Sequence, residues 1–227
     1  MTKQFHHDVE ELKERVVAMG QLAVKSLHEA TDALVRRDAA LAADVMRLEN
    51  EVDRLDVEIE TRVVDLIALH QPMAKDLRFL AGSMKIITYL DRIGRYGYDI
   101  AKAAGRTMES PTKVPRGIES MAIRARNLVL QALEGYRTGD AATARSAIAA
   151  DDAVDDLYDE VFRASLTFMM QDPATIPSMT EYLLAARHLE RAADNGVKVA
   201  EKAIYIATGE RRRRDTAAGA PPGGSVR

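Results

Sequence analysis

Cysteine is missing from this 227-residue sequence, and tryptophan is missing as well. Without cysteine, disulfide bonds and thiolate metal sites are excluded, and a reducing compartment is allowed. Aromatic residues make up only 5% of the chain, while alanine, leucine, glutamate and arginine are plentiful. Because these residues are strong helix formers, the composition predicts helices held together by small aliphatic contacts.

Long apolar runs and an excess of one charge are also absent. No stretch of about 18 apolar residues could span a bilayer, and no apolar segment follows a basic start as in a signal peptide. The 32 Lys and Arg residues nearly balance the 35 Asp and Glu residues, which gives a net charge of -3. The chain therefore has no global basic field for nucleic acid. We expect a soluble cytoplasmic protein that meets a membrane only through partners.

Catalytic motifs are the third absence. The sequence contains no Gly-rich phosphate loop after a strand, no H-E-x-x-H and no G-x-S-x-G. It also lacks a predicted strand that would display such a motif. We therefore predict that the protein is not an enzyme.

Helical periodicity is what the sequence does contain. Apolar residues recur every three or four positions through three segments, at about 5–37, 38–69 and 72–108. Pro72 can occupy the first turn of the third helix, and it pushes the preceding residue out of the helical region. In the third segment, the predicted inward-facing row is Leu77, Leu80, Met84, Ile87, Asp91, Gly94, Tyr98 and Ala101. Asp91 stands where a hydrophobe is expected, so it requires a cation, a base or solvent beside it.

The second half of the chain repeats the first. A shift of 102 residues aligns Asp38 with Asp140 and Asp53 with Asp155. Between the halves, residues 109–115 contain two prolines and no periodicity, which indicates a linker. Because short connections make neighbouring helices antiparallel, the predicted fold is all-α, with two tandem up-down-up three-helix bundles from an internal duplication. The predicted bundles are residues 1–108 and 116–209, followed by a disordered tail at 210–227.

Acids four residues apart recur at matching places in the two halves. Side chains at i and i+4 share one face of a helix, and like charges so placed repel each other unless a hard cation lies between them. Three such pairs are intact: Glu49 with Asp53, Asp151 with Asp155, and Glu190 with Asp194. The recurrence predicts a metal site built from carboxylate oxygens.

The fourth place is altered, because Arg95 lies between Asp91 and Asp99. An acid, a base and an acid at i, i+4 and i+8 form an ion-pair ladder, which can neutralise this face without a metal. We therefore predict that Arg95 occupies Asp91 and that metal binds mainly through the second repeat. The Glu-x-x-His pattern of di-iron bundles is absent, so His70 and His188 are interpreted as packing or surface residues.

A metal-free interpretation stays open. In a helical protein with 30% charged residues, acids at i and i+4 arise often, and most of them lie on solvated faces. In this alternative the chain is a helical scaffold or adaptor for another transporter or regulator. Its acids then solvate the bundle or dock on a basic partner.

Two segments resemble the PhoU family of phosphate-uptake regulators. They are QPMAKDLRFLAGSMKIITYLDRIGRYGYDIAK and its weaker echo DPATIPSMTEYLLAARHLERAADNGVKVAE, within a duplicated three-helix layout. The resemblance covers about residues 1–209. It implies two three-helix bundles, a tendency to form homodimers, no enzymatic activity, and E(D)xxxD(N) motifs that bind metal ions in multinuclear clusters.

The resemblance also implies site residues, a cofactor and partners. The acids that match the family's motifs by position are Glu49, Asp53, Asp91, Asp99, Asp151, Asp155, Glu190 and Asp194. Arg95 stands where the family usually has an acid, and Lys198 stands where it often has Asn. The implied cofactor is a divalent or ferric metal ion, with iron, zinc, manganese and magnesium as candidates. The implied function is to repress phosphate-starvation signalling and restrain uptake, by contact with a phosphate-sensing histidine kinase and the ATPase subunit of a phosphate ABC importer.

Overall fold

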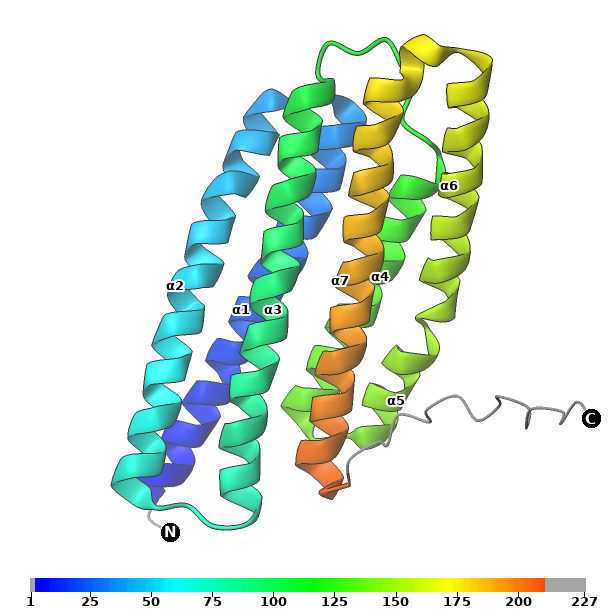
Figure 1. Ribbon diagram of the computed structural model, residues 1–227. Helices are drawn as coiled ribbons and strands as arrows, with labels where there is room; N and C mark the ends of the chain where they lie inside the picture. The colour runs from blue at the N-terminus through cyan, green and yellow to red at the C-terminus, as the bar shows by residue number, and fades with distance from the viewer. Residues whose placement is uncertain (1–2, 211–227) are drawn as a thin grey trace, which may run out of the picture.

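The computed structural model describes residues 3–210, which form helices joined by short turns and one longer linker (Figure 1). The first half contains α1 (Lys3–Arg36), α2 (Ala39–His70) and α3 (Lys75–Thr107). The second half contains α4 (Gly117–Thr138), α5 (Ala141–Ala149), α6 (Asp152–Gln171), the 3-10 helix η1 (Pro173–Thr175) and α7 (Ile176–Thr208). No strand occurs within residues 3–210, which confirms the predicted all-α class.

The helices form two three-helix bundles that lie side by side. In Figure 1, α1, α2 and α3 run up, down and up, and after the linker α4 runs down, α5 and α6 run up, and α7 runs down. Contacts of α3 with α7 and of α1 with α4 join the two bundles, while α2 and α6 lie at opposite outer edges. The tandem-bundle prediction is confirmed, and the buried side chains of both halves form one continuous core.

Equivalent acids begin the second helix of each half. Asp38 precedes α2, and its carboxylate accepts a hydrogen bond from the backbone N–H of Leu41 at 3.0 Å. Asp140 precedes α5, and its carboxylate accepts one from the N–H of Ala142 at 2.9 Å. Such N-caps satisfy backbone donors that the start of a helix leaves unpaired. The repeated aspartate therefore marks the same turn in both copies of the duplicated unit.

The second helix of the second half is interrupted, which the sequence pattern did not predict. Between α5 and α6, the N–H of Ala150 donates to the carbonyl of Ala147 at 3.2 Å and that of Asp151 donates to Ile148 at 3.3 Å. These tighter three-residue bonds replace the four-residue ladder of the α-helix. Asp151 and Asp152 then stand at the start of α6, where the positive end of the helix dipole favours acids. The break thus places acids at a helix start.

The third helix, α3, is buried over a wider arc than the predicted row. Four members of that row are buried, but Leu77 is 41% exposed and was wrongly expected to face inward. Leu90, Ile93 and Ile100 lie outside the row and are fully buried. The reason is that α3 packs against α1, α2 and α7, so its buried surface spans several faces.

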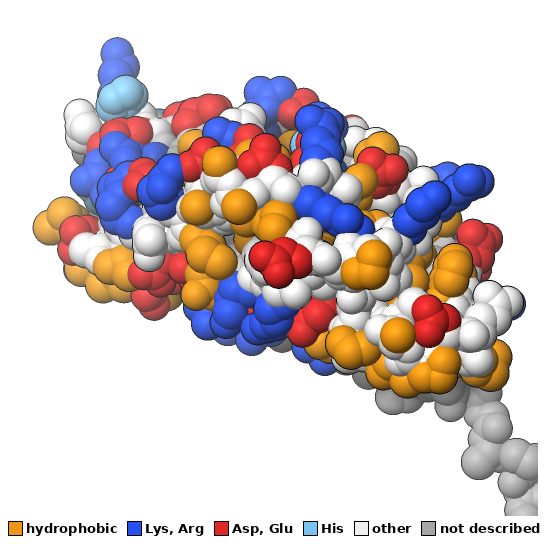
Figure 2. Space-filling view, turned by 90° about the horizontal axis from the view of Figure 1, so that it is seen from above, with side chains coloured by type: hydrophobic (Ala, Val, Ile, Leu, Met, Phe, Trp, Pro, Cys, Tyr) orange, Lys and Arg blue, Asp and Glu red, His pale blue; other side chains and the backbone are white. Residues whose placement is uncertain are grey.

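Charges of both signs are interspersed on the face seen from above, with hydrophobic side chains between them (Figure 2). This face therefore carries no field of a single sign, in keeping with the nearly balanced composition. No helix within residues 3–210 combines the length and apolar character needed to cross a membrane. Most of the predicted disordered tail, residues 211–227, lies outside the described part of the chain. The separate folding of residues 1–108 and 116–209 stays a prediction.

Glycine permits the closest approach of α3 to α1. A methyl group at Gly97 would lie 2.2 Å from the Ser26 hydroxyl oxygen and 2.8 Å from the Ser26 carbonyl carbon. The equivalent Gly196 of α7 is confined mainly by side chains, because a methyl group there would lie 2.5 Å from a Leu128 methyl carbon of α4. In each bundle the third helix therefore meets the first through a residue that has no side chain.

We predict that Gly97→Ala lowers the free energy of unfolding by about 1 to 3 kcal/mol, because the backbone at Ser26 cannot yield without separating the two helices. Gly105 in the same helix has open space around it, so Gly105→Ala is the matched control. This control should raise the free energy of unfolding by about 0.5 to 1 kcal/mol through helix propensity alone. Urea unfolding followed by circular dichroism measures the free energy of unfolding of both variants. Changes of equal size and sign in the two variants would refute the close packing at Gly97.

Candidate functional site

Four acids of the second repeat gather where α6 begins beside α7. Asp151 lies at the break between α5 and α6, and Asp155 lies one turn further along. Glu190 and Asp194 lie one turn apart on α7. The charge of Asp194 acts on each of the other three, so the structure brings these two pairs together.

Burial and repulsion by neighbouring acids raise the pKa of Asp151, Asp155 and Glu190. Half-burial and the nearby charges of Asp155 and Asp194 raise the pKa of Asp151 to about 6. Burial also raises the pKa of Asp155, with repulsion from Asp194 as the next cause. The negative charges of these three groups are disfavoured where they stand, so a cation beside them would relieve the repulsion.

Glu190 is largely enclosed, with a side chain that is 14% exposed. Its Oε1 accepts a hydrogen bond from the Arg187 guanidinium at 2.9 Å. Its Oε2 is buried and has no hydrogen-bond partner among the described residues. Burial raises the pKa of Glu190, although Arg187 opposes the rise. An acceptor oxygen therefore remains available between the helices.

The first repeat neutralises its acids differently. Arg95 Nη1 of α3 donates to Glu49 Oε1 of α2 at 2.8 Å, and the guanidinium lies 5.1 Å from the centre of the Tyr98 ring. The prediction that Arg95 pairs with Asp91 is therefore wrong, because its ion-pair partner is Glu49. The long arginine side chain reaches the carboxylate of Glu49 on the neighbouring helix while its guanidinium lies over the Tyr98 ring of its own helix. Asp91 keeps a raised pKa, because burial and the charges of Asp53 and Glu49 outweigh Arg95.

Asp56 also belongs to the acid group of the first repeat, and it was missed because only acid pairs that recur in both repeats were considered. Burial and the charge of Asp91 raise the pKa of Asp56 to about 6. Glu49, Asp53, Asp56 and Glu60 stand at successive steps of four, three and four, which is a helical stripe. A search for acid stripes within one helix, without a match in the other repeat, would have found it. The equivalent position in the second repeat is Tyr158.

Asp99 lies at the junction of the two bundles, where its charge acts on His188 of α7. The His188 ring stacks on Tyr96 of α3 with the ring centres 5.6 Å apart. Burial lowers the pKa of His188, and Asp99 opposes that change. His188 thus packs between the two bundles. His70 packs within the first bundle, on Phe5, with ring centres 5.1 Å apart. Both are packing residues, one of the two roles predicted from the sequence.

Chelating geometry is not present in the structure as it stands. Within residues 3–210, no three aspartate, glutamate or histidine side chains are close enough together to hold one metal ion. The arrangement supplies two groups of repelling carboxylates, one partly neutralised by Arg95 and the other by Arg187. Such groups can attract a hard cation or a basic protein surface.

Comparison with protein families gives one match for each repeat. A model described as the PhoU domain matches residues 16–104 and residues 118–203. The first match lies within α1 to α3 and the second within α4 to α7. The duplication read from the sequence therefore coincides with two copies of a known domain.

Curated relatives and solved structures match over almost the whole chain. A phosphate-specific transport system accessory protein PhoU homolog from Aquifex aeolicus is 36% identical, and the match covers 89% of this chain and 92% of the relative. The homolog of the same name from Clostridium acetobutylicum is 32% identical, with coverage of 92% and 96%. The crystal structure of PhoU from Pseudomonas aeruginosa superposes with a TM-score of 0.86 at 30% identity, covering 91% of this chain and 100% of that one.

We predict that the free energy of unfolding of metal-free protein falls as the pH rises from about 4 to about 6. The folded-state pKa of Asp151 is about 6, whereas an unfolded aspartate titrates near 3.9, so the folded state binds more protons within this window. Asp151→Asn should remove the part of this dependence that Asp151 contributes and raise stability at pH 7 by about 1 kcal/mol, after allowance for solvent screening. Its side chain makes no capping hydrogen bond, so no cap is lost.

Urea unfolding in the presence of a chelator, at several pH values, measures this effect. The control is Asp65→Asn, because Asp65 is an exposed acid of α2. A stability that rises with pH in the wild type, or the same change in both variants, would contradict the electrostatic account.

Proposed function

This chain belongs to the PhoU family, and we propose that it is a non-enzymatic regulator of phosphate uptake and of phosphate-starvation signalling. The curated relatives are named accessory proteins of a phosphate-specific transport system, and they match both repeats. That match over the full length of the relatives carries the proposal. The all-helical fold, with no catalytic motif in its sequence, suits regulation by contact with other proteins.

The proposed partners are the ATPase subunit of a phosphate ABC importer and a phosphate-sensing histidine kinase. The chain would meet both on the cytoplasmic side of the membrane, as a homodimer. A role as accessory to a transport system supports association with its components. The described residues offer no spanning helix, so membrane association would come through these partners.

We predict that the purified protein co-sediments with proteoliposomes that contain the importer or the kinase. It should remain in the supernatant with protein-free liposomes of the same composition, because its own charge is nearly balanced. Removal of residues 211–227, which include four consecutive arginines, is the control for attraction to anionic lipid. Equal binding to liposomes with and without the partners would contradict action through a partner.

We also propose that the second repeat binds a divalent or ferric metal ion. The candidate ligands are Asp151, Asp155, Glu190 and Asp194, whose carboxylate oxygens are the kind of ligand that hard cations prefer. Two observations support the fit: the raised pKa values in this group and the unpartnered buried Oε2 of Glu190. Bound metal would supply positive charge that holds α6 against α7.

The first repeat is the weaker candidate for metal binding. Its acids are Glu49, Asp53, Asp91 and Asp99, together with Asp56. Arg95 already pairs with Glu49, and a guanidinium stays charged throughout the accessible pH range. An incoming cation would have to displace this arginine and also overcome its repulsion. This ion pair also favours the alternative function, a metal-free scaffold whose acids are balanced by neighbouring arginines.

We predict that Glu190→Ala combined with Asp194→Ala removes most Mn²⁺ binding in calorimetric titration of untagged protein. Asp91→Ala should change binding little, because the first repeat contributes little. Arg95→Ala should add binding in the first repeat, since it frees Glu49 and removes a positive charge. Equal losses from the second-repeat double variant and Asp91→Ala would show that the repeats bind alike. No binding by the wild type would favour the metal-free scaffold.

A further inference from the structure

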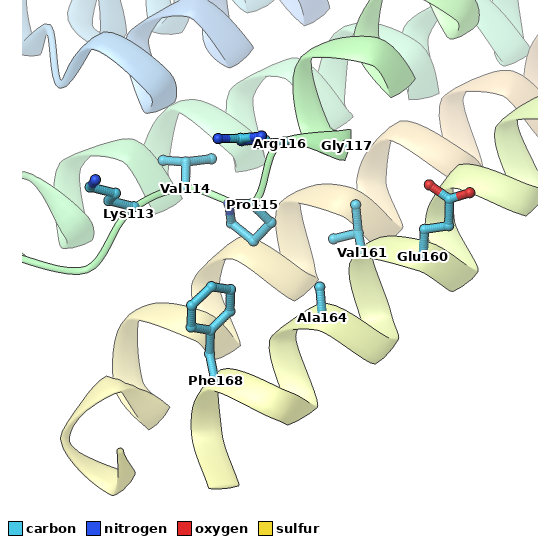
Figure 3. Close-up of a pocket in the computed structure, with 9 residues that line it drawn as sticks. All are labelled: Lys113, Val114, Pro115, Arg116, Gly117, Glu160, Val161, Ala164 and Phe168. Atoms are coloured by element: carbon cyan, nitrogen blue, oxygen red, sulfur yellow. The ribbon is translucent and has the colours of Figure 1, made fainter. Parts of the chain in front are cut away.

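A groove of about 500 Å³ lies between the linker and α6 (Figure 3). Val114 and Pro115 border it on the linker side, and Val161, Ala164 and Phe168 border it on the side of α6. Pro115 and Phe168 point toward each other across the opening in Figure 3. This groove lies on different residues of α6 from the acid group described above, so metal binding does not account for it.

The internal duplication shows what fills the equivalent place in the first repeat. The shift of 102 residues relates Ile59, Arg62 and Leu66 of α2 to Val161, Ala164 and Phe168 of α6. Ile59 and Val161 are both buried, at 0% and 1% exposure, so the two helices have the same orientation in their bundles. Further along, the equivalence fails: Leu66 is 2% exposed, whereas Phe168 is 45% exposed.

The difference arises from the length of the first helix in each repeat. α1 begins at Lys3, whereas α4 begins at Gly117, which is equivalent to Arg15. The first three turns of α1 therefore have no helical counterpart, and the linker runs through that region instead (Figure 1). Leu66 is covered by a helix in the first repeat, and Phe168 lacks that cover in the second.

The first three turns of α1 hold α2 through both apolar and charged contacts. Phe5 is buried and packs on His70, and Leu12 is buried beside the same face. Asp8 accepts a hydrogen bond from Arg62 at 2.9 Å, and Arg15 pairs with Glu58. Phe5 and Leu12 are the apolar anchors of this segment. They are seven residues apart, which is the spacing used when an amphipathic helix binds a groove.

The groove keeps part of this recognition pattern. Glu160 is equivalent to Glu58, lies at one end of the groove, and has no ion-pair partner among the described residues. Arg62 is replaced by Ala164, so α6 offers no cation for an acid at the Asp8 place, and the cations that line the groove are Lys113 and Arg116 of the linker. A fitting helix would therefore carry two large apolar residues seven apart and a basic residue three positions after the second.

We propose that this groove binds an amphipathic helix of about three turns from a partner protein, which completes the second bundle as the start of α1 completes the first. The apolar anchors of that helix would cover Phe168 and Val161, and its basic residue would pair with Glu160. The proposal goes beyond the regulatory function above and does not depend on metal binding. Its test requires neither importer nor kinase, so failure would leave that function standing.

The test uses the one helix of known fit, a fluorescent synthetic peptide of residues 3–18, KQFHHDVEELKERVVA, added to the full-length protein. Fluorescence anisotropy should show saturable binding to the wild type. Phe168→Ser should weaken binding about tenfold or more, because it removes the aromatic anchor site. Phe162→Ser is the matched control, since Phe162 is 41% exposed on the same helix but does not line the groove, and it should bind as the wild type does.

Two charge variants test the register of the bound helix. Glu160→Gln should weaken binding by removing the partner of the peptide's Arg15. Ala164→Arg restores the cation that Arg62 provides to Asp8, so it should tighten binding roughly threefold. That gain should vanish with a peptide that carries Asp8→Asn.

Three outcomes would overturn the proposal: no saturable binding, unchanged binding by Phe168→Ser, or equal losses with Phe162→Ser. If the peptide instead separates a wild-type dimer in sedimentation experiments, the occupant is α1 of a second copy. That result would also overturn the assignment to a partner protein. Unchanged circular dichroism and thermal midpoints would show that these exposed substitutions leave the fold intact.

Discussion

The close contact of α3 with α1 at Gly97 positions most of the first bundle, and Gly196 has the same role between α7 and α4. Side-chain-free contacts bring helix axes closer together than ordinary packing allows, so the remaining faces of α3 and α7 are free to meet each other. That contact joins the two bundles through one continuous core. Asp91 and Glu190 are consequently held at fixed, half-buried places on the central helices, where their charges are costly.

The charges of the acid groups are balanced differently in the two repeats. In the first, Arg95 reaches across from α3 to α2 and neutralises Glu49. In the second, the equivalent residue is Asp194, which adds a further negative charge to the group. Arg187 offsets one oxygen of Glu190 but leaves the other without a partner. The difference between Arg95 and Asp194 therefore adds a positive charge to one acid group and a negative charge to the other.

The duplication is also unequal in length. Because the three helical turns that open α1 have no counterpart in the second bundle, the linker takes their place beside the upper part of α6 (Figure 1). Just three of the 20 residues of α6 are buried: Val154, Val161 and Ser165. An outer helix with so small a buried face gains less from packing than α2 does. This incompleteness is a property of the whole chain, since it is apparent only when the two copies are compared.

The sequence by itself determined the helical class, the duplication and the identity of the paired acids. Helical periodicity and repeated motifs are local properties, and Asp38 and Asp140, which the repeat aligns, cap equivalent helices in the structure. Only the tertiary structure decided which groups meet. Arg95 has acids four residues away on both sides but pairs with Glu49 of another helix, and Leu77 fits the helical period but lies in solvent. Periodicity describes a single helix. The partner of a long side chain and the width of a buried face depend instead on the number of helices that surround that helix.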